Sequence, residues 1–91
     1  MKRILILLCL PLLTLAQQTY VPDDNFEAYL EANGMGNGIA NDDYVFTSAI
    51  DTLNYLDVSG WGVPQNQTIS VLTGIEDFTA LDTLNCQSNQ L

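Results

Sequence analysis

The sequence predicts an α/β fold in which short parallel strands stack into a right-handed β-α solenoid behind a helical amino-terminal cap. Residues 81–91 fit the repeat pattern L-x-x-L-x-L-x-x-N/C-x-L at every fixed position, with Cys86 in place of the central leucine. Residues 53–63 fit its apolar positions as well, 28 residues earlier (81 − 53). An amphipathic helical pattern precedes both copies, as expected for a cap on the end of a solenoid.

The repeat pattern is that of a leucine-rich repeat, and each fixed position has a physical role. Alternation through Leu84 and Cys86 predicts a short strand whose side chains enter the core at every second position. Leu81 and Leu91 are expected to close that core at either end. Asn89 falls where the chain leaves the strand, and we expect its amide to bond backbone groups of the turn.

The first copy of the pattern is irregular, because Trp61 stands where the pattern has Asn. The four apolar positions are held by Leu53, Leu56, Val58 and Val63. A repeat that borders a cap is often atypical, since only one of its neighbours is another repeat. We therefore interpret residues 53–80 as an atypical first repeat and residue 81 as the start of a second one.

The segment between the two copies is expected to form a compact return path. After a polar excursion at residues 64–67, apolar residues recur at every third position, at Ile69, Leu72, Ile75, Phe78 and Leu81. A period of three is typical of a 3₁₀ turn. Thr73 and Glu76 have the spacing of a capping box, which predicts a short turn through Phe78.

An α-helix is predicted over residues 24–32. Asp24 and Glu27 have the spacing of a capping box, so we expect Asp24 to accept from the backbone at Glu27 while Glu27 reaches back. The apolar side chains of this segment share one face, formed by Phe26, Tyr29 and Leu30. An Asn-Gly pair follows, and both residue types tolerate the left-handed conformation that ends a helix. Residues 17–22 are expected to be an extended lead-in.

Residues 1–16 have the features of a cleaved secretory signal peptide. Two basic residues are followed by an apolar run and then by small residues. The run is too short for a comfortable transmembrane span. Lipid attachment at Cys9 would require a small residue before it, where the chain has Leu8, so we favour an inert cysteine in a discarded peptide.

The predicted organisation has three parts: the signal peptide at 1–16, a helical cap and loop at 17–48, and leucine-rich repeats at 49–91. Because repeat arrays need about three or more units and a polar end cap, the truncated second repeat predicts that the chain is the amino-terminal piece of a longer protein. After cleavage of the signal peptide, we expect the protein to be secreted or held at the cell surface.

The charge of the chain excludes several classes of partner. The only basic residues, Lys2 and Arg3, lie in the signal peptide, so residues 17–91 carry eleven carboxylates and no basic side chain. Such a surface repels nucleic acid and anionic lipid, and we expect no nucleic-acid partner and no direct membrane insertion. Cys86 is the only cysteine after cleavage, so no intramolecular disulfide can form.

The loop at residues 33–43 is rich in Gly and Asn and raises the hypothesis of a calcium site. Its oxygen-bearing candidates are Asn37, Asn41, Asp42 and Asp43. The spacing does not fit an EF-hand, because no register gives alternating acids followed by a Glu at the twelfth position. We favour turn formation as the role of these residues, since Asn and Asp are common turn formers.

No catalytic residue, metal ligand set or cofactor is predicted. The chain contains no histidine, so Cys86 has no imidazole partner, and its inward position predicts a small buried hydrophobe. One cysteine without histidine disfavours a zinc site. Adjacent acids such as Glu76-Asp77 are explained better as solvated turn residues than as a facing acid/base pair.

The candidate ligand-binding residues are the strand residues that alternation directs away from the core. They are Tyr55, Asp57 and Ser59 in the first copy and Thr83, Asn85 and Gln87 in the second. In a solenoid these side chains line the concave face, and Tyr55 is the best contact candidate because a rigid amphipathic ring costs little entropy to immobilise. We favour the alternative that a cap-proximal repeat only ends the array, with the contacts on later repeats.

Three segments together resemble the start of secreted bacterial leucine-rich-repeat proteins, with the internalin-like surface proteins as looser relatives. The segments are Val21-Pro-Asp-Asp-Asn-Phe26, Thr73-Gly-Ile-Glu-Asp-Phe78 and Leu84-Asn-Cys86 with Asn89-Gln-Leu91. The resemblance implies an exported protein-interaction or adhesion module with a protein or glycan ligand. The alternatives are a structural spacer and an accessory domain of a larger exported hydrolase.

Overall fold

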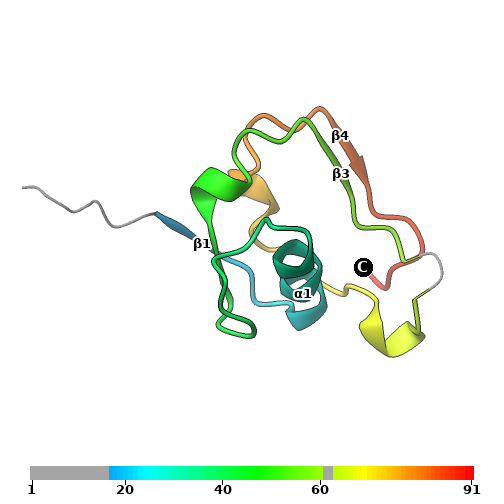
Figure 1. Ribbon diagram of the computed structural model, residues 1–91. Coiled ribbons are helices and arrows are strands. Elements are labelled where there is room, and N and C mark those ends of the chain that lie inside the picture. The colour runs from blue at the N-terminus through cyan, green and yellow to red at the C-terminus, as the bar shows by residue number, and fades with distance from the viewer. Residues whose placement is uncertain (1–16, 61–62) are drawn as a thin grey trace, which may run out of the picture.

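The computed structural model describes residues 17–60 and 63–91, so the predicted signal peptide and Trp61 lie outside the described residues. The chain runs through the following elements: β1 (Gln18–Tyr20), α1 (Asp24–Ala32), β2 (Tyr44–Phe46), η2 (Thr47–Ala49), β3 (Tyr55–Asp57), η3 (Gln65–Gln67), η4 (Ile75–Asp77) and β4 (Thr83–Asn85). Figure 1 shows β3 and β4 running side by side, and α1 lies near the segment that connects them. Within the described ranges, no helix is long and apolar enough to cross a membrane.

The described strands form two separate two-stranded sheets. β1 pairs antiparallel with β2, and Thr19 lies opposite Val45. β3 pairs parallel with β4, and Leu56 lies opposite Leu84. The parallel pair needs a long crossover, as parallel strands always do, and the connection from β3 to β4 contains two 3₁₀ turns.

The prediction of a right-handed leucine-rich-repeat solenoid is wrong for this structure. Residues 17–60 and 63–91 form a small α/β unit with one α-helix and two short sheets, and no repeat architecture is evident in them. A solenoid core requires several stacked units, whereas here only one parallel pair forms. Leu84, which the repeat pattern directs into the core, is 37% exposed, whereas its partner Leu56 is 2% exposed.

Helix α1 has the predicted bounds but a different cap. The N-cap is Asp23, whose Oδ1 accepts from the backbone N–H groups of Asn25 and Phe26, each at 3.0 Å. The predicted capping box fails because Glu27 does not reach back to the cap. Its carboxylate turns inward to the loop after the helix. Asn33 is the C-cap, and Gly34 follows with a φ of 75°, as the Asn-Gly pair predicts.

The second carboxylate oxygen of Asp23 joins the start of α1 to the crossover, the segment that connects β3 to β4, through hydrogen bonds. Asp23 Oδ2 accepts from the backbone N–H groups of Ser70 at 2.9 Å and Val71 at 3.0 Å. Burial alone would raise the pKa of Asp23, but bonds from Phe26, Ser70, Val71 and Asn25 outweigh it, so the pKa is lowered. Asp23 is therefore a charged link between α1 and residues 70–71.

One apolar core joins the helix, the strands and the crossover. Its buried members come from many parts of the described chain: Val21, Phe26, Leu30, Val45, Ile50, Leu56, Val58, Ile69 and Phe78. The rings of Phe26 and Phe78 stack with centroids 6.1 Å apart, so the helix packs against the end of η4. Burial of one such aromatic side chain contributes about 1.5–3 kcal/mol. The core thus anchors β3 through Leu56.

A buried hydroxyl network ties the antiparallel sheet to η4. Thr19, which is 1% exposed, donates from Oγ1 to Asp77 Oδ2 at 2.8 Å. The Oγ1 atoms of Thr19 and Thr47 lie 2.7 Å apart. The sequence predicts an extended lead-in here but not its pairing with β2, because the pairing depends on contacts between distant residues.

The crossover contains the predicted 3₁₀ turn at Ile75–Asp77, together with a second one at Gln65–Gln67 within the polar excursion. The expected capping box is incomplete, because the residue before η4 is Gly74 and its N–H donates to Glu76 at 3.0 Å. Gly74 has a φ of 106°, and a Cβ there would lie 2.7 Å from the carbonyl oxygen of Tyr20. The position therefore requires glycine.

Candidate functional site

The face of the β3–β4 sheet that points away from the core brings four of the predicted ligand residues together. The register places Tyr55 opposite Thr83 and Asp57 opposite Asn85. Successive residues of a strand point to opposite faces, so these four side chains share one face while Leu56 points into the core. We call Tyr55, Asp57, Thr83 and Asn85 the sheet face. Tyr55 is 57% exposed, so its ring is open to a ligand.

Ser59 and Gln87, the other two predicted residues, lie just beyond the strands and shape the sheet face through their backbones. Ser59 N–H donates to Asp57 Oδ1 at 3.0 Å, and Gln87 N–H donates to Asn85 Oδ1 at 3.2 Å. The two strands therefore end in the same local bond, in which a side-chain oxygen accepts from the residue two positions later. This bond fixes the direction of the Asp57 and Asn85 side chains.

Asp57 is an ionised group on this face. The backbone N–H of Ser59, and then its hydroxyl, lower the pKa of Asp57, because both stabilise the charged form. The Tyr55 hydroxyl donates to Asp57 Oδ2 over 3.4 Å, a long and weak bond. Oδ2 is therefore available to a stronger donor from a ligand.

Tyr29 is an aromatic residue whose pKa responds to a charge on the sheet face. It belongs to α1 and is half-buried against the core. Burial, and then the negative charge of Asp57, raise the pKa of Tyr29. Its hydroxyl thus lies within electrostatic reach of the sheet face. The sequence places Tyr29 in the apolar stripe of the helix and does not predict this proximity.

Two open hollows border these residues. One has a volume of about 460 Å³ and is lined by Tyr55, Thr83, Leu84, Asn85, Cys86 and Gln87. The other, of about 450 Å³, is lined by Asn25, Ala28, Tyr29, Val63 and Gln67. Leu84 and the half-buried Cys86 give the first hollow an apolar wall beside its polar groups. The arrangement suits an extended ligand better than a small enclosed one.

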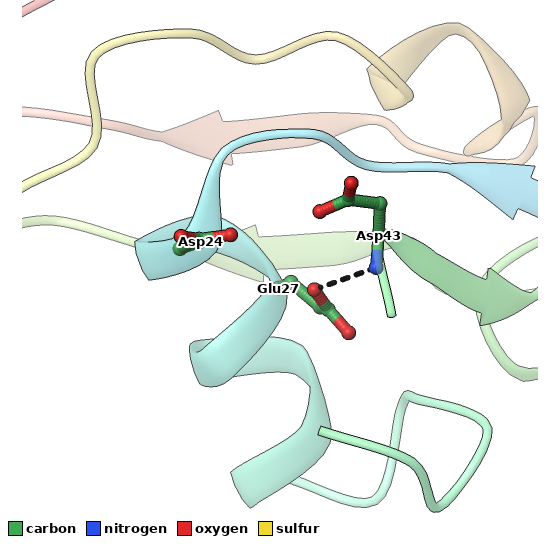
Figure 2. A group of neighbouring side chains, drawn as sticks. All are labelled: Asp24, Glu27 and Asp43. Carbon is green, nitrogen blue, oxygen red and sulfur yellow. Dashed lines mark hydrogen bonds between the residues drawn. The ribbon is translucent and has the colours of Figure 1, made fainter. Parts of the chain in front are cut away.

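A cluster of acids lies where α1 meets the loop at residues 33–43. Figure 2 shows Asp24, Glu27 and Asp43 near one another, with the N–H of Asp43 bonded to Glu27. Glu27 is fully buried and accepts from Asp42 N–H at 3.2 Å and from Asp43 N–H at 3.1 Å. Burial, and then the Asp42 carboxyl, raise the pKa of Glu27 despite these two bonds.

Glu31 holds the other end of the same loop. Its carboxylate accepts from Asn37 N–H at 2.9 Å and from Gly38 N–H at 3.0 Å. Residues 27 and 31 are four apart and therefore share one face of the helix. The carboxylates of Glu27 and Glu31 thus accept hydrogen bonds from four backbone N–H groups of the loop. The sequence does not predict this role, because nothing in the local pattern shows which backbone groups a helix face will meet.

The residues proposed for calcium act within the loop as turn formers. Asn37 donates from Nδ2 to Asp42 Oδ2 at 2.6 Å, and Asp42 Oδ1 accepts from Tyr44 N–H at 3.1 Å. Asn41 and Asp43 adopt the left-handed conformation, with φ values of 62° and 68°. These are the roles expected of Asn and Asp in turns.

Carboxylate oxygens do converge around Glu27, and this convergence is chemically suited to a hard cation. In each of two groups, Asp24–Glu27–Asp43 and Glu27–Glu31–Asp42, one oxygen per residue lies within 4.8 Å of the others. Glu27 already accepts two backbone bonds, however, and acidic groups are common in proteins without an ion. The sheet face is therefore the stronger candidate site.

Comparison with known proteins found no matching family model, no matching curated protein and no matching solved structure. The resemblance to secreted bacterial leucine-rich-repeat proteins therefore rests on the sequence motifs alone.

Proposed function

We propose that this protein is exported and binds a protein or glycan ligand through the sheet face. Export is supported by the basic and apolar pattern of residues 1–16. Binding is supported by one observation above the others: the parallel register gathers Tyr55, Asp57, Thr83 and Asn85 on one accessible surface. An aromatic ring, a carboxylate, a hydroxyl and an amide are groups through which recognition surfaces make contact.

The sheet face is also held rigidly, as recognition requires. Leu56 anchors β3 in the core, and Asn89 fixes the turn after β4. Asn89 Oδ1 accepts from Ile69 N–H at 2.9 Å, while Nδ2 donates to the carbonyls of Val58 at 2.9 Å and Cys86 at 3.1 Å. A surface ordered before binding loses less entropy when the ligand arrives.

Binding of the purified full chain to a glycan array and to a panel of purified extracellular proteins tests the proposal. The variant Tyr55→Ala/Asn85→Ala should weaken any binding by about tenfold or more, since exposed aromatic residues commonly dominate such contacts. The variant Ile39→Ala is the matched control, because Ile39 is 58% exposed in the loop at residues 33–43, away from the sheet face.

Two results would contradict the proposal. The first is a full chain that binds none of the probes. The second is a double variant that binds as tightly as the unchanged chain. A chain that is retained in the cytoplasm of its native host would contradict the export part separately.

A further inference from the structure

If the sheet face is the binding surface proposed above, the charge of the protein indicates the chemical class of its partner. All eleven carboxylates of the protein lie within residues 17–60 and 63–91, and this part of the chain contains no Lys, Arg or His. Its negative field is therefore not neutralised from within. A field of one sign attracts partners of the other and repels those of its own. A cationic partner is favoured, and an acidic one is disfavoured.

The sheet face carries the chemistry that recognises a cation at close range. Tyr55 offers an exposed ring whose face is the negative part of its quadrupole. Two positions along the strand, Asp57 offers a carboxylate that its bond from Ser59 keeps ionised and oriented. The weak 3.4 Å bond from Tyr55 leaves Asp57 Oδ2 open to replacement by a charged donor.

We propose that the sheet face binds an arginine side chain of an extended segment in a protein partner. The planar guanidinium lies over the ring of Tyr55 and donates to Asp57, a combination that uses both its flat surface and its fork of N–H groups. Asn85 and Thr83, opposite on β4, offer an amide and a hydroxyl to the backbone of the same segment.

Arginine suits this geometry better than lysine or a glycan. A lysine ammonium is a strongly hydrated point charge, and it cannot stack a flat surface on the ring while donating to the carboxylate. A neutral glycan would stack on Tyr55 and donate hydroxyls to Asp57, but it would bring no positive charge to the carboxylate.

The test is a titration of the ¹⁵N-labelled full chain with the peptide Gly-Arg-Gly-Arg-Gly amide, followed by NMR at about 0.15 M salt to screen long-range attraction. The expected result is saturable shifts at Tyr55, Asp57, Ser59, Thr83 and Asn85. Substitution of both arginines by lysine should weaken binding by about threefold or more. Tyr55→Ala and Asp57→Asn should each weaken it by about threefold to fivefold, as expected for one exposed cation–π contact or ion pair.

Matched variants separate recognition from general attraction. Tyr55→Phe keeps the ring and should keep most of the affinity. Asp51→Asn removes the same charge outside the sheet face and should change the affinity by less than about twofold. A thermal melt of each variant checks that it folds.

The outcomes distinguish this inference from the proposed function. Equal binding of the arginine and lysine peptides, or equal weakening by Asp51→Asn and Asp57→Asn, would overturn the inference. A glycan that binds and is lost in Tyr55→Ala/Asn85→Ala would overturn the inference and leave the proposed function standing. Failure of every probe on the sheet face would overturn both.

Discussion

The carboxylate of Asp23 accepts the backbone N–H of Val71 at 3.0 Å, across 48 residues of sequence. The same side chain caps α1, so a single residue orders the start of the helix and a segment of the crossover together. This link sets the position of the crossover, and the crossover in turn brings β4 back beside β3. The sheet face depends on a residue that lies well outside it.

Asp23→Asn should make the protein less stable at neutral pH and less sensitive to acid. The pKa of Asp23 is lowered in the folded state, so its contribution is present above the unfolded pKa and is lost as pH falls through the folded pKa. We expect a loss of about 1–3 kcal/mol at pH 7, which shrinks as pH falls through the lowered pKa of Asp23. Denaturant unfolding of both chains from about pH 7 to about pH 3 measures the difference.

Asp24→Asn is the matched control for this experiment, since it removes the same charge at an exposed position beside the cap. It should leave the pH dependence nearly unchanged. Equal pH profiles for the two variants would show that Asp23 acts only through the net charge of the chain.

The two glutamates that clamp the loop at residues 33–43 should differ in their contribution to stability. Glu27→Ala leaves the N–H groups of Asp42 and Asp43 without their acceptor in a buried site, at a cost of about 1–3 kcal/mol. Glu31→Ala acts where water can replace the carboxylate, so we expect a loss of about 1 kcal/mol or less. Chemical unfolding ranks the two, and a larger loss for Glu31→Ala would contradict the burial argument.

The raised pKa of Glu27 predicts that the stability lost in Glu27→Ala depends on pH. The pKa is raised in the folded state, so the ionised form is disfavoured there. The cost of ionisation is absent below the unfolded pKa and becomes complete as pH rises through the folded pKa. The stability lost in Glu27→Ala, measured by chemical unfolding, should therefore be larger at about pH 4 than at about pH 8. A loss that grows with pH would have the opposite sign and would refute this reasoning.

Asn89 should tolerate neither removal nor conversion to an acid. Asn89→Ala leaves the N–H of Ile69 and the carbonyls of Val58 and Cys86 without their bonds, and we expect a loss of about 2–4 kcal/mol. Asn89→Asp keeps an acceptor for Ile69 but places a carboxylate against two carbonyl oxygens. Thermal melts of both variants should show lowered midpoints.

Gln87→Ala is the matched control for the Asn89 variants, because Gln87 is exposed in the same turn. Its backbone carbonyl accepts from Gly60 N–H at 2.8 Å, and this bond survives the substitution. The midpoint of Gln87→Ala should stay close to that of the unchanged chain. Equal midpoints for Gln87→Ala and Asn89→Ala would show that the Asn89 bonds contribute little.

Gly60 should resist substitution because the backbone of Ser88 lies against it. A Cβ at Gly60 would meet the carbonyl oxygen of Ser88 and lie 3.1 Å from Cγ2 of Thr68. Gly60→Ala therefore has to move the turn after β4 away from the end of β3. We expect a loss of about 1–3 kcal/mol in chemical unfolding.

The local features of this fold were predictable from the sequence. The bounds of α1 follow from an amphipathic stripe and an Asn-Gly stop, both of which lie within the helix or next to it. The bonds of Asn89 follow from its position at the end of a strand. The identity of the cap was not predictable, because Asp23 and Asp24 are adjacent and only the bonds to Ser70 and Val71 separate their roles.

The larger architecture was predicted wrongly for a physical reason. An apolar pattern specifies strands and their inward positions, but the stacking of many repeats depends on surfaces that the pattern does not describe. Leu84 fits the pattern and is nevertheless 37% exposed, since β4 packs on only one neighbouring strand in the described residues. The antiparallel pairing of β1 with β2 left no periodic signal, because each strand is three residues long.

The candidate site was predictable only within its strands. Alternation places Tyr55 and Asp57 on one face, and the equal spacing of the two copies places Thr83 and Asn85 beside them. Tyr29 comes from another element, and its approach depends on how the helix packs. Likewise, the burial of Glu27 follows from where the loop at residues 33–43 returns to the helix.

The order of strand pairing also determines when this protein can fold. β3 pairs with β4, which is synthesised 28 residues later (83 − 55). The bond from Thr19 to Asp77 likewise cannot form until Asp77 has been synthesised. Many stabilising contacts join residues that are far apart in the sequence, and such topologies fold slowly because loop closure precedes any gain from the contacts. The nascent chain should remain unfolded until Asn85 has been made, which is the state in which a polypeptide can be threaded through a narrow translocation channel.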